Sequence, residues 1–526
     1  MQPLVEEMIG PHGPSKSSPG PVQQPSSVLE GLRNEVRSRW PEWAAISCFA
    51  ALVAFAIPWH EPWSDEAQAW QLARSLSLPA LFQTYIRYEG TPGLWHFLLW
   101  VLIRARVSYS GLHWICGVIA VAAASLLVVK SPFPRYLKLA LPFTFFLLFQ
   151  YAVVARSYVL VPLLLFLVAL QWKRSPAAIA LLLGLLANVA LHASVISAGL
   201  AIVYFLEKVR SGGVKDPGRR RQLLFFSIIL VCFYAFALWT AWPPGDLPTS
   251  SFRGPSRPLF ILALGSLSMG VCQPLILALP FWIAVALCLR ARHSLLYLLP
   301  VLFFAAFSGA VYVHFFHSGI LAPLLMCIFW ITWPAPGCGH SRREAFGRAA
   351  LVFMAGVQIL WSAYALGYDH FRAYSPAPAT AEFLRPFVRD GDTIAVTHLG
   401  KIENQDYEDV GILPYFDHNI LANQQDPFWR WGPQNKTEVR FDALLPSRPQ
   451  IVLVEALPEP GQPVNLNDAK ADLLFKSGYR FTNQFCGRIP ARLDFFGGPT
   501  CFLIFQSTGS PQEPPANKAS QASAPN

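Results

Sequence analysis

The stretch that decides the fold is residues 61–90, EPWSDEAQAWQLARSLSLPALFQTYIRYEG, which lies between apolar runs at residues 44–59 and 92–103. It holds four carboxylates: Glu61, Asp65, Glu66 and Glu89. The next acidic residue along the chain is Glu207. Carboxylates beside a bilayer are costly and are usually kept there for function. We therefore expect residues 60–91 to form the first external loop between two membrane spans, and this loop to carry chemistry.

The composition around this loop is that of a membrane protein. Of the 526 residues, 53% are hydrophobic and 14% are charged, and the mean hydropathy is +0.37. A soluble protein has about 25% charged residues. Apolar runs recur from residue 44 to residue 368, which the rise of a helix and the thickness of a bilayer convert into about 11 to 13 spans. The sequence predicts a polytopic α-helical membrane protein.

The basic residues indicate the orientation of the chain. The net charge is +10 and the Lys and Arg residues cluster in loops, most clearly at Lys208–Arg221, Arg290–His293 and Arg342–Arg348. By the positive-inside rule these loops and the N-terminus are cytoplasmic, so the charge indicates topology and not nucleic-acid binding. The run at about residues 92–106 is then expected to return to the inside, with Arg104 and Arg106 at its inner end.

The composition also divides the chain. Residues 1–40 are rich in Pro, Ser, Gly and Gln and are predicted to be a disordered cytoplasmic tail. Residues 41–367 form the transmembrane domain. Polar residues return in residues 368–507, for which we expect a small extracytoplasmic α/β domain. Residues 508–526 are predicted to be a second disordered tail.

The expected α/β domain has short elements with Pro and Gly between them. The pattern predicts helices at 380–388 and 469–476 and strands at 393–397, 451–455 and 501–506. Cys486 and Cys501 either form a disulfide, if this part is extracytoplasmic, or remain two buried thiols.

The first loop has the residues for acid–base chemistry. Ser64 is a candidate N-cap of an amphipathic helix, which puts Asp65 and Glu66 at its N-terminus, where the helix dipole favours an ionised carboxylate. Such a carboxylate can take a proton from an acceptor hydroxyl during glycosyl transfer. If the sugar is donated by a polyprenyl phosphate, hydrogen-bond donors or cations are needed to hold the departing phosphate. The candidates are Arg87, Arg156, Arg253, Arg257, His314 and His317.

Four pieces of sequence resemble the GT-C superfamily of integral-membrane glycosyltransferases. They are DEAQAW (65–70), RYEGTPGLWHFLL (87–99), ARSYVL (155–160) and FHSGIL (316–321). These segments are most similar to the bacterial branch related to protein mannosyltransferases, and within it to the RgtA/B/C/D-like group. Phe316 stands where that group usually has the Arg of an Arg-His-x-Gly pattern.

The resemblance implies a cavity that opens to the outer face of a bacterial inner membrane. It implies a polyprenyl-phosphate-linked sugar donor, an acceptor hydroxyl on a glycan, lipid or protein, and transfer with inversion. Asp65 is implied as the general base with Glu66 beside it as support. By position, the substrate-binding residues are Arg87, Glu89, Arg156 and His317. No ligand set for a divalent metal is evident, so no cofactor is assigned.

Two other classes of function remain open. A flippase or transporter of polyprenyl-linked glycans is one, although coupled transporters usually carry carboxylates inside their spans. This chain has none between Glu89 and Glu207 or between Asp246 and Glu344. A non-catalytic membrane scaffold is the other, with the C-terminal domain as its binding part. A nucleotide-binding loop of the GxGxxG or GxxxxGK[ST] kind is not found in a strand–turn–helix context.

Overall fold

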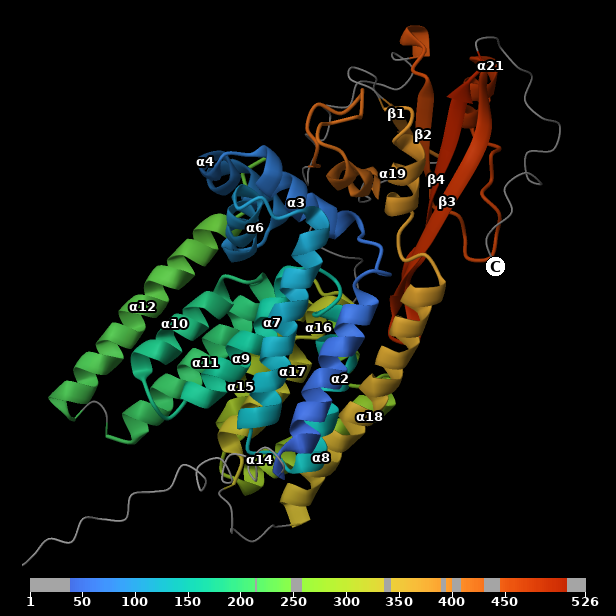
Figure 1. The fold of residues 1–526 in the computed structure, drawn as a ribbon. Coiled ribbons are helices and arrows are strands. Elements are labelled where there is room, and N and C mark those ends of the chain that lie inside the picture. Colours follow the sequence, from blue (N-terminus) through green and yellow to red (C-terminus); the bar gives the residue numbers. More distant parts are fainter. Residues whose placement is uncertain are drawn as a thin grey trace, which may run out of the picture.

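The computed structural model describes residues 38–212, 215–246, 258–334, 342–388, 394–399, 408–429 and 445–508. It is a helical bundle with a sheet domain at one end, as Figure 1 shows. The expected polytopic helical fold with a small C-terminal domain is thus observed. The two tails expected to be disordered lie, apart from a few residues, outside the described residues.

Twelve apolar helical segments make up the bundle in the described residues. Five of them are long and apolar enough to cross a membrane: α7 (Tyr109–Lys130), α11 (Leu191–Arg210), α12 (Pro217–Ala241), the pair α16 and α17 (Phe315–Thr332), and most of α18 (Ala345–Phe371). The shorter ones are α2 (Trp40–Ala56), α6 (Leu94–Arg104), α9 (Leu160–Gln171), α10 (Pro176–Ala187), α13 (Leu259–Met269), α14 (Leu275–Ala291) and α15 (Leu299–Ala310). The number of spans, about 11 to 13, stays a prediction.

The connections between the helices gather at two ends of the bundle (Figure 1). One end, called the α8 end after α8 (Arg135–Ala140), joins segments far apart in sequence. Arg135 pairs with Glu42 at 3.0 Å. The rings of Phe133 and Trp333 lie 5.0 Å apart, and the guanidinium of Arg292 lies over Trp333. The described residues of the basic clusters found in the sequence lie at this end, around the C-termini of α11 and α14 and the N-termini of α12 and α18.

The opposite end, called the α3 end, carries the acidic stretch. There α3 (Ser64–Ser75), α4 (Leu78–Ala80) and α5 (Ile86–Glu89) follow α2. The Leu94 N–H donates to the carbonyl of Asn188 at 3.1 Å, and the Tyr88 hydroxyl donates to Asp246 at 2.7 Å. The acidic stretch therefore contacts the segment after α12, and the residues that follow the stretch contact the end of α10.

The expectation that residues 92–106 form a returning span is wrong. The helix there, α6, has 11 residues, which is about 16 Å and roughly half of a 30 Å hydrocarbon core. It stays at the α3 end and lies along α3 (Figure 1). Arg104 donates from Nη1 to the carbonyl of Ala73 at 3.0 Å and from Nη2 to that of Leu76 at 3.2 Å. The loop therefore runs from α2 to the start of α7, and its second apolar run covers α3.

The C-terminal domain is built on a four-stranded sheet of order β1-β2-β4-β3. The strands are β1 (Ala395–His398), β2 (Ile451–Ala456), β3 (Tyr479–Ala491) and β4 (Asp494–Ser507), with β1 and β2 parallel and the rest antiparallel. Its helices α19 (Ala377–Leu384) and α21 (Ala469–Lys476) lie close to the expected positions. Of the two alternatives for Cys486 and Cys501, the structure has the disulfide, which joins β3 to β4.

The sheet domain packs against the acidic stretch. The short helical segment η7 (Glu408–Tyr415) lies beside α3, and Arg74 of α3 donates to the carbonyls of Phe416 at 2.8 Å and Leu413 at 3.3 Å. The Ser375 N–H donates to Glu61 at 3.2 Å. One face of the loop therefore meets the bundle and the other meets the domain.

Candidate active site

Two neighbouring carboxylates begin α3 and have different surroundings. The helix starts at Ser64, one residue after the cap position at Trp63, and Glu66 accepts the Trp63 N–H at 3.2 Å. A side chain at this position that reaches back to the cap is a common way to begin a helix. Successive residues on a helix point about 100° apart. Asp65 therefore points into a cavity while Glu66 points into the protein.

Asp65 forms an ion pair with Arg156, with Nη1 and Oδ2 2.6 Å apart. Both side chains are about four-fifths buried, at 17% and 19% exposure. Arg156 comes from the extended segment between Gln150 and α9, so the bundle supplies the cation and the loop supplies the carboxylate. The guanidinium lies 4.7 Å from the ring centre of Phe316 and 5.5 Å from that of Tyr158. These rings hold the cation in place by cation–π contact.

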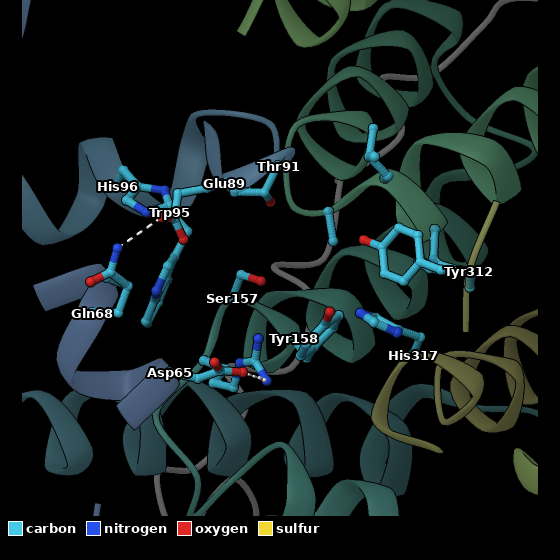
Figure 2. A pocket seen from close by; sticks show the side chains of 15 residues that line it. Asp65, Gln68, Glu89, Thr91, Trp95, His96, Ser157, Tyr158, Tyr312 and His317 are labelled. Carbon is cyan, nitrogen blue, oxygen red and sulfur yellow. Dashed lines mark hydrogen bonds and ion pairs between the residues drawn. The ribbon is translucent and has the colours of Figure 1, made fainter. Parts of the chain in front are cut away.

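The ion pair lies at the wall of a polar cavity between α3, α6 and the ends of the bundle helices (Figure 2). The cavity leaves about 110 Å³ for the centres of water molecules. Four of the six site residues predicted from the sequence line it: Asp65, Glu89, Arg156 and His317. The other lining residues are Gln68, Ala69, Thr91, Trp95, His96, Ser157, Tyr158, Ala190, Leu191, His192 and Tyr312. The structure thus brings residues from distant parts of the chain to one place.

Glu89 is held by Gln68, a residue that the sequence analysis passed over. Gln68 Nε2 donates to Glu89 at 2.8 Å and to the carbonyl of Trp429 at 2.9 Å. The Trp429 N–H donates back to Gln68 Oε1 at 3.0 Å. Gly90, with a φ of 58°, turns the chain away directly after Glu89. Gln68 lies one helical turn after Asp65 and so on the same face of α3, and this spacing could have identified it as a site residue from the sequence.

Histidines form the far wall of the cavity. The rings of His192 and His317 stack with centres 4.3 Å apart, and the His314 N–H donates to Nδ1 of His317 at 3.0 Å. His192 donates from Nε2 to the carbonyl of Tyr312 at 3.0 Å. His192 itself is buried and lines the cavity.

Three polar side-chain atoms on the two sides of the cavity have no hydrogen-bond partner among the described residues. They are both ring nitrogens of His96 and Nδ1 of His192. Both side chains are buried, with relative exposures of 2% and 0%. Buried polar atoms are nearly always paired, so unpaired ones that line a cavity point to a polar ligand.

Glu66 lies behind the ion pair and does not line the cavity. It accepts hydrogen bonds from His60 at 3.2 Å, from His113 at 3.1 Å and from the Ala155 N–H. Burial alone would lower the pKa of His60, but the carboxylates of Asp369 and Glu66 outweigh it and raise that pKa to about 10. Burial would also raise the pKa of Glu66, but the neighbouring imidazoles hold it well below its usual range. Glu66 is therefore an ionised, fully paired carboxylate.

The other predicted cations lie elsewhere. Arg87 is outside the cavity wall and donates from Nε to the carbonyl of Trp242 at 2.9 Å. His314 lies beside His317, with ring centres 5.6 Å apart. Arg253 and Arg257 lie outside the described residues. Arg156 is thus the predicted arginine that the structure places in the cavity wall.

Comparison with known proteins gives one distant match. No family model matches the chain, and no curated protein matches it. A search of solved structures finds the arabinofuranosyltransferase AftD from Mycobacteria, with 14% identity and a TM-score of 0.34. The match covers 91% of this chain and 40% of that one, so the chain spans well under half of that enzyme. A similarity this low assigns no activity, which has to be inferred from the site.

Proposed function

We propose that this protein is a GT-C-type glycosyltransferase that moves a sugar from a polyprenyl-phosphate donor to an acceptor hydroxyl. The observation that carries the proposal is the Asp65–Arg156 ion pair in the wall of a polar cavity. The pair consists of a carboxylate from the loop and a guanidinium from the bundle, 2.6 Å apart, which supports the roles of proton acceptor and phosphate-binding cation. A direct displacement needs both groups at one reacting centre.

In the proposed reaction the acceptor hydroxyl gives its proton to the Asp65 carboxylate. The acceptor oxygen forms a bond to the anomeric carbon while the bond from that carbon to the phosphate oxygen breaks. The electron pair leaves with the polyprenyl phosphate, whose charge Arg156 binds. Attack opposite to the leaving group inverts the anomeric centre. Donor binding would draw Arg156 from Asp65 to the phosphate and free the carboxylate to act as the base.

The rest of the cavity suits a sugar. Trp95 offers an aromatic face, and Gln68, Glu89, Thr91 and His96 offer donors and acceptors on the same side (Figure 2). The ring nitrogens of His96 have no partner in the described part of the chain and would bind sugar hydroxyls.

The proposed orientation puts the cavity at the outer face of a bacterial inner membrane. The described residues of the basic clusters lie at the α8 end, which the positive-inside rule assigns to the cytoplasm. The sheet domain at the opposite end contains the Cys486–Cys501 disulfide, and disulfides persist in oxidising compartments. The donor would enter from the membrane, and a glycan, lipid or protein acceptor from outside.

The proposal is tested by turnover of a panel of polyprenyl-phosphate sugars by purified protein, with membrane extract as the source of acceptor. Asp65→Asn keeps the size of the side chain but removes the base, so we expect a loss of about 10² to 10⁴-fold with donor binding retained. Glu382→Gln is the matched control, because Glu382 is exposed and pairs only with the neighbouring Arg385 in the described residues. Equal turnover by Asp65→Asn and wild type would remove Asp65 from the chemistry. Failure of wild type to use any donor would favour a flippase.

A further inference from the structure

A second polar cluster lies behind the ion pair and is not used by the proposed reaction. It consists of His60, Glu66 and His113, called here the His–Glu–His cluster, whose ligand-type atoms all lie within 4.8 Å of one another. His60 follows α2, Glu66 is in the first turn of α3 and His113 is in the first turns of α7. The side chains of His60 and Glu66 are 0% exposed and that of His113 is 4% exposed. The cluster is therefore closed off from solvent.

Each imidazole in the cluster has an acceptor at both nitrogens. Nδ1 of His113 lies 3.2 Å from the carbonyl of Tyr109, which can only accept, so this nitrogen carries a hydrogen. Nδ1 of His60 lies 3.2 Å from the carboxylate of Asp369. The Nε2 atoms of both rings face the Glu66 carboxylate, at 3.2 Å and 3.1 Å. A neutral ring would turn a lone pair toward a carboxylate oxygen there, so either a ring proton or a metal ion lies between each ring and the carboxylate.

We propose that a zinc ion lies there, bound by Nε2 of His60, Nε2 of His113 and the carboxylate of Glu66. Two ligands of a tetrahedral zinc, each about 2.0–2.2 Å from the metal, lie roughly 3.4 Å apart, close to the observed separations. Zinc-bound histidines usually donate their other N–H to a carboxylate or a backbone carbonyl, as His60 and His113 do here. Imidazole nitrogens select zinc over magnesium or calcium.

The charges around the cluster also fit a divalent ion. Glu66 belongs to the cluster and Asp369 contacts it, so the charge of one Zn²⁺ would balance these two carboxylates. Buried charges are tolerated when they are paired or bind a metal. The ion supplies the same two positive charges as two additional protons, and it also links the three chain segments by bonds stronger than hydrogen bonds.

The ion would fix the geometry of the Asp65–Arg156 pair without touching substrate. Glu66 is adjacent to Asp65, and it accepts the N–H of Ala155, which is adjacent to Arg156. Metal at Glu66 would therefore hold both partners of the ion pair at once. The site is structural, since the cavity and the cluster share no lining residue. This inference does not depend on the sugar-transfer proposal.

The first test is the metal content of full-length wild-type protein, purified with an affinity tag that contains no histidine and washed briefly with chelator. We expect about one zinc per chain by plasma mass spectrometry. Prolonged chelation should remove the ion and lower the melting temperature by several degrees, and added Zn²⁺ but not Mg²⁺ should restore it. Wild type without stoichiometric metal and without a Zn²⁺-dependent rise in melting temperature would overturn the proposal, leaving a hydrogen-bonded cluster.

The second test uses variants that separate binding from folding. His113→Gln removes one ligand but keeps a polar side chain, and we expect the zinc content to fall at least several-fold. His418→Ala is the matched control, because His418 is exposed in the C-terminal domain, and it should keep the wild-type content. Full zinc content in a monodisperse His113→Gln protein would contradict the assignment. If the variant does not fold, the wild-type measurements still decide the question.

Discussion

At the scale of single residues, the site divides two adjacent carboxylates between different roles. Asp65 is partly exposed and pairs with a cation at the cavity wall, whereas Glu66 is 1% exposed and accepts from two histidines and two backbone N–H groups. A general base needs access to the reacting hydroxyl, which Asp65 has and Glu66 lacks. In the proposed reaction, Asp65 is the base and Glu66 is the residue that anchors the start of α3.

Substitution of Arg156 should lower turnover much more than substitution of Arg87, which the sequence also predicts as a substrate-binding residue. Arg156→Lys keeps the charge but loses the planar fork that binds phosphate oxygens, so we expect a higher KM for the donor and about 10-fold lower kcat/KM. Arg156→Ala should cost about 10²-fold or more. Arg87→Ala should change little, because Arg87 lies outside the cavity wall. Steady-state kinetics at varied donor concentration measure all three, and equal losses for Arg87→Ala and Arg156→Ala would contradict this site.

The charged residues of the site and His317 could be predicted from the sequence, whereas its other neutral polar residues could not. Asp65, Glu89 and Arg156 stand out because charge is rare near apolar runs, and the structure brings them together. Gln68, His96 and His192 do not stand out, because a neutral polar residue on an apolar helix is as often a surface residue as a site residue. Only the folded chain, which places α3, α6 and the start of α11 around one cavity, brings them together.

At the scale of elements, α6 shows that hydropathy alone does not identify a membrane span. Its residues are as apolar as a span, but it is too short to cross a bilayer and its last arginine binds carbonyls of α3. Strand β3 was not predicted, because apolar and polar residues do not alternate regularly along it and many of its residues are partly exposed. Helices α19 and α21 were found because their apolar residues recur at helical spacing.

The position of α6 can be tested by cysteine labelling in intact cells. Ser110 is exposed at the start of α7, and the structure puts it at the same end as α3. Ser110→Cys should therefore react with a membrane-impermeant maleimide without permeabilisation, given the proposed orientation. Ser211→Cys, exposed after α11 near the opposite end, should react only after permeabilisation. Matching behaviour of the two variants would restore residues 92–106 as a returning span.

At the scale of the whole molecule, the bundle and the sheet domain meet through a tight contact. The Arg488 N–H donates to the carbonyl of Ala373 at 3.0 Å. A Cβ on Gly487 would lie 2.6 Å from Cα of Ser375, in the linker between α18 and α19. A real Cβ does not come so close to backbone, so the glycine permits β3 to lie on the linker.

Gly487→Ala should consequently loosen this contact. Overpacking of this kind costs about 1–3 kcal/mol, so we expect a lower melting temperature in detergent and faster proteolysis between the bundle and the domain. Gly498→Ala is the matched control, since its nearest atom would be 3.4 Å away in ordinary contact. Indistinguishable melting curves for the two variants would show that β3 can move away from the linker without cost.

The paired hydrogen bonds between Gln68 and Trp429 have a consequence for how such chains can be recombined. Trp429 belongs to the C-terminal part, yet its backbone fixes the side chain that positions Glu89 in the cavity. A chimaera made by joining this bundle to the terminal part of another protein would fold its helices and still present a misplaced Glu89. Exchange of the C-terminal part between two such proteins would keep Glu89 in place only if α3 and the segment that ends at Trp429 came from the same protein.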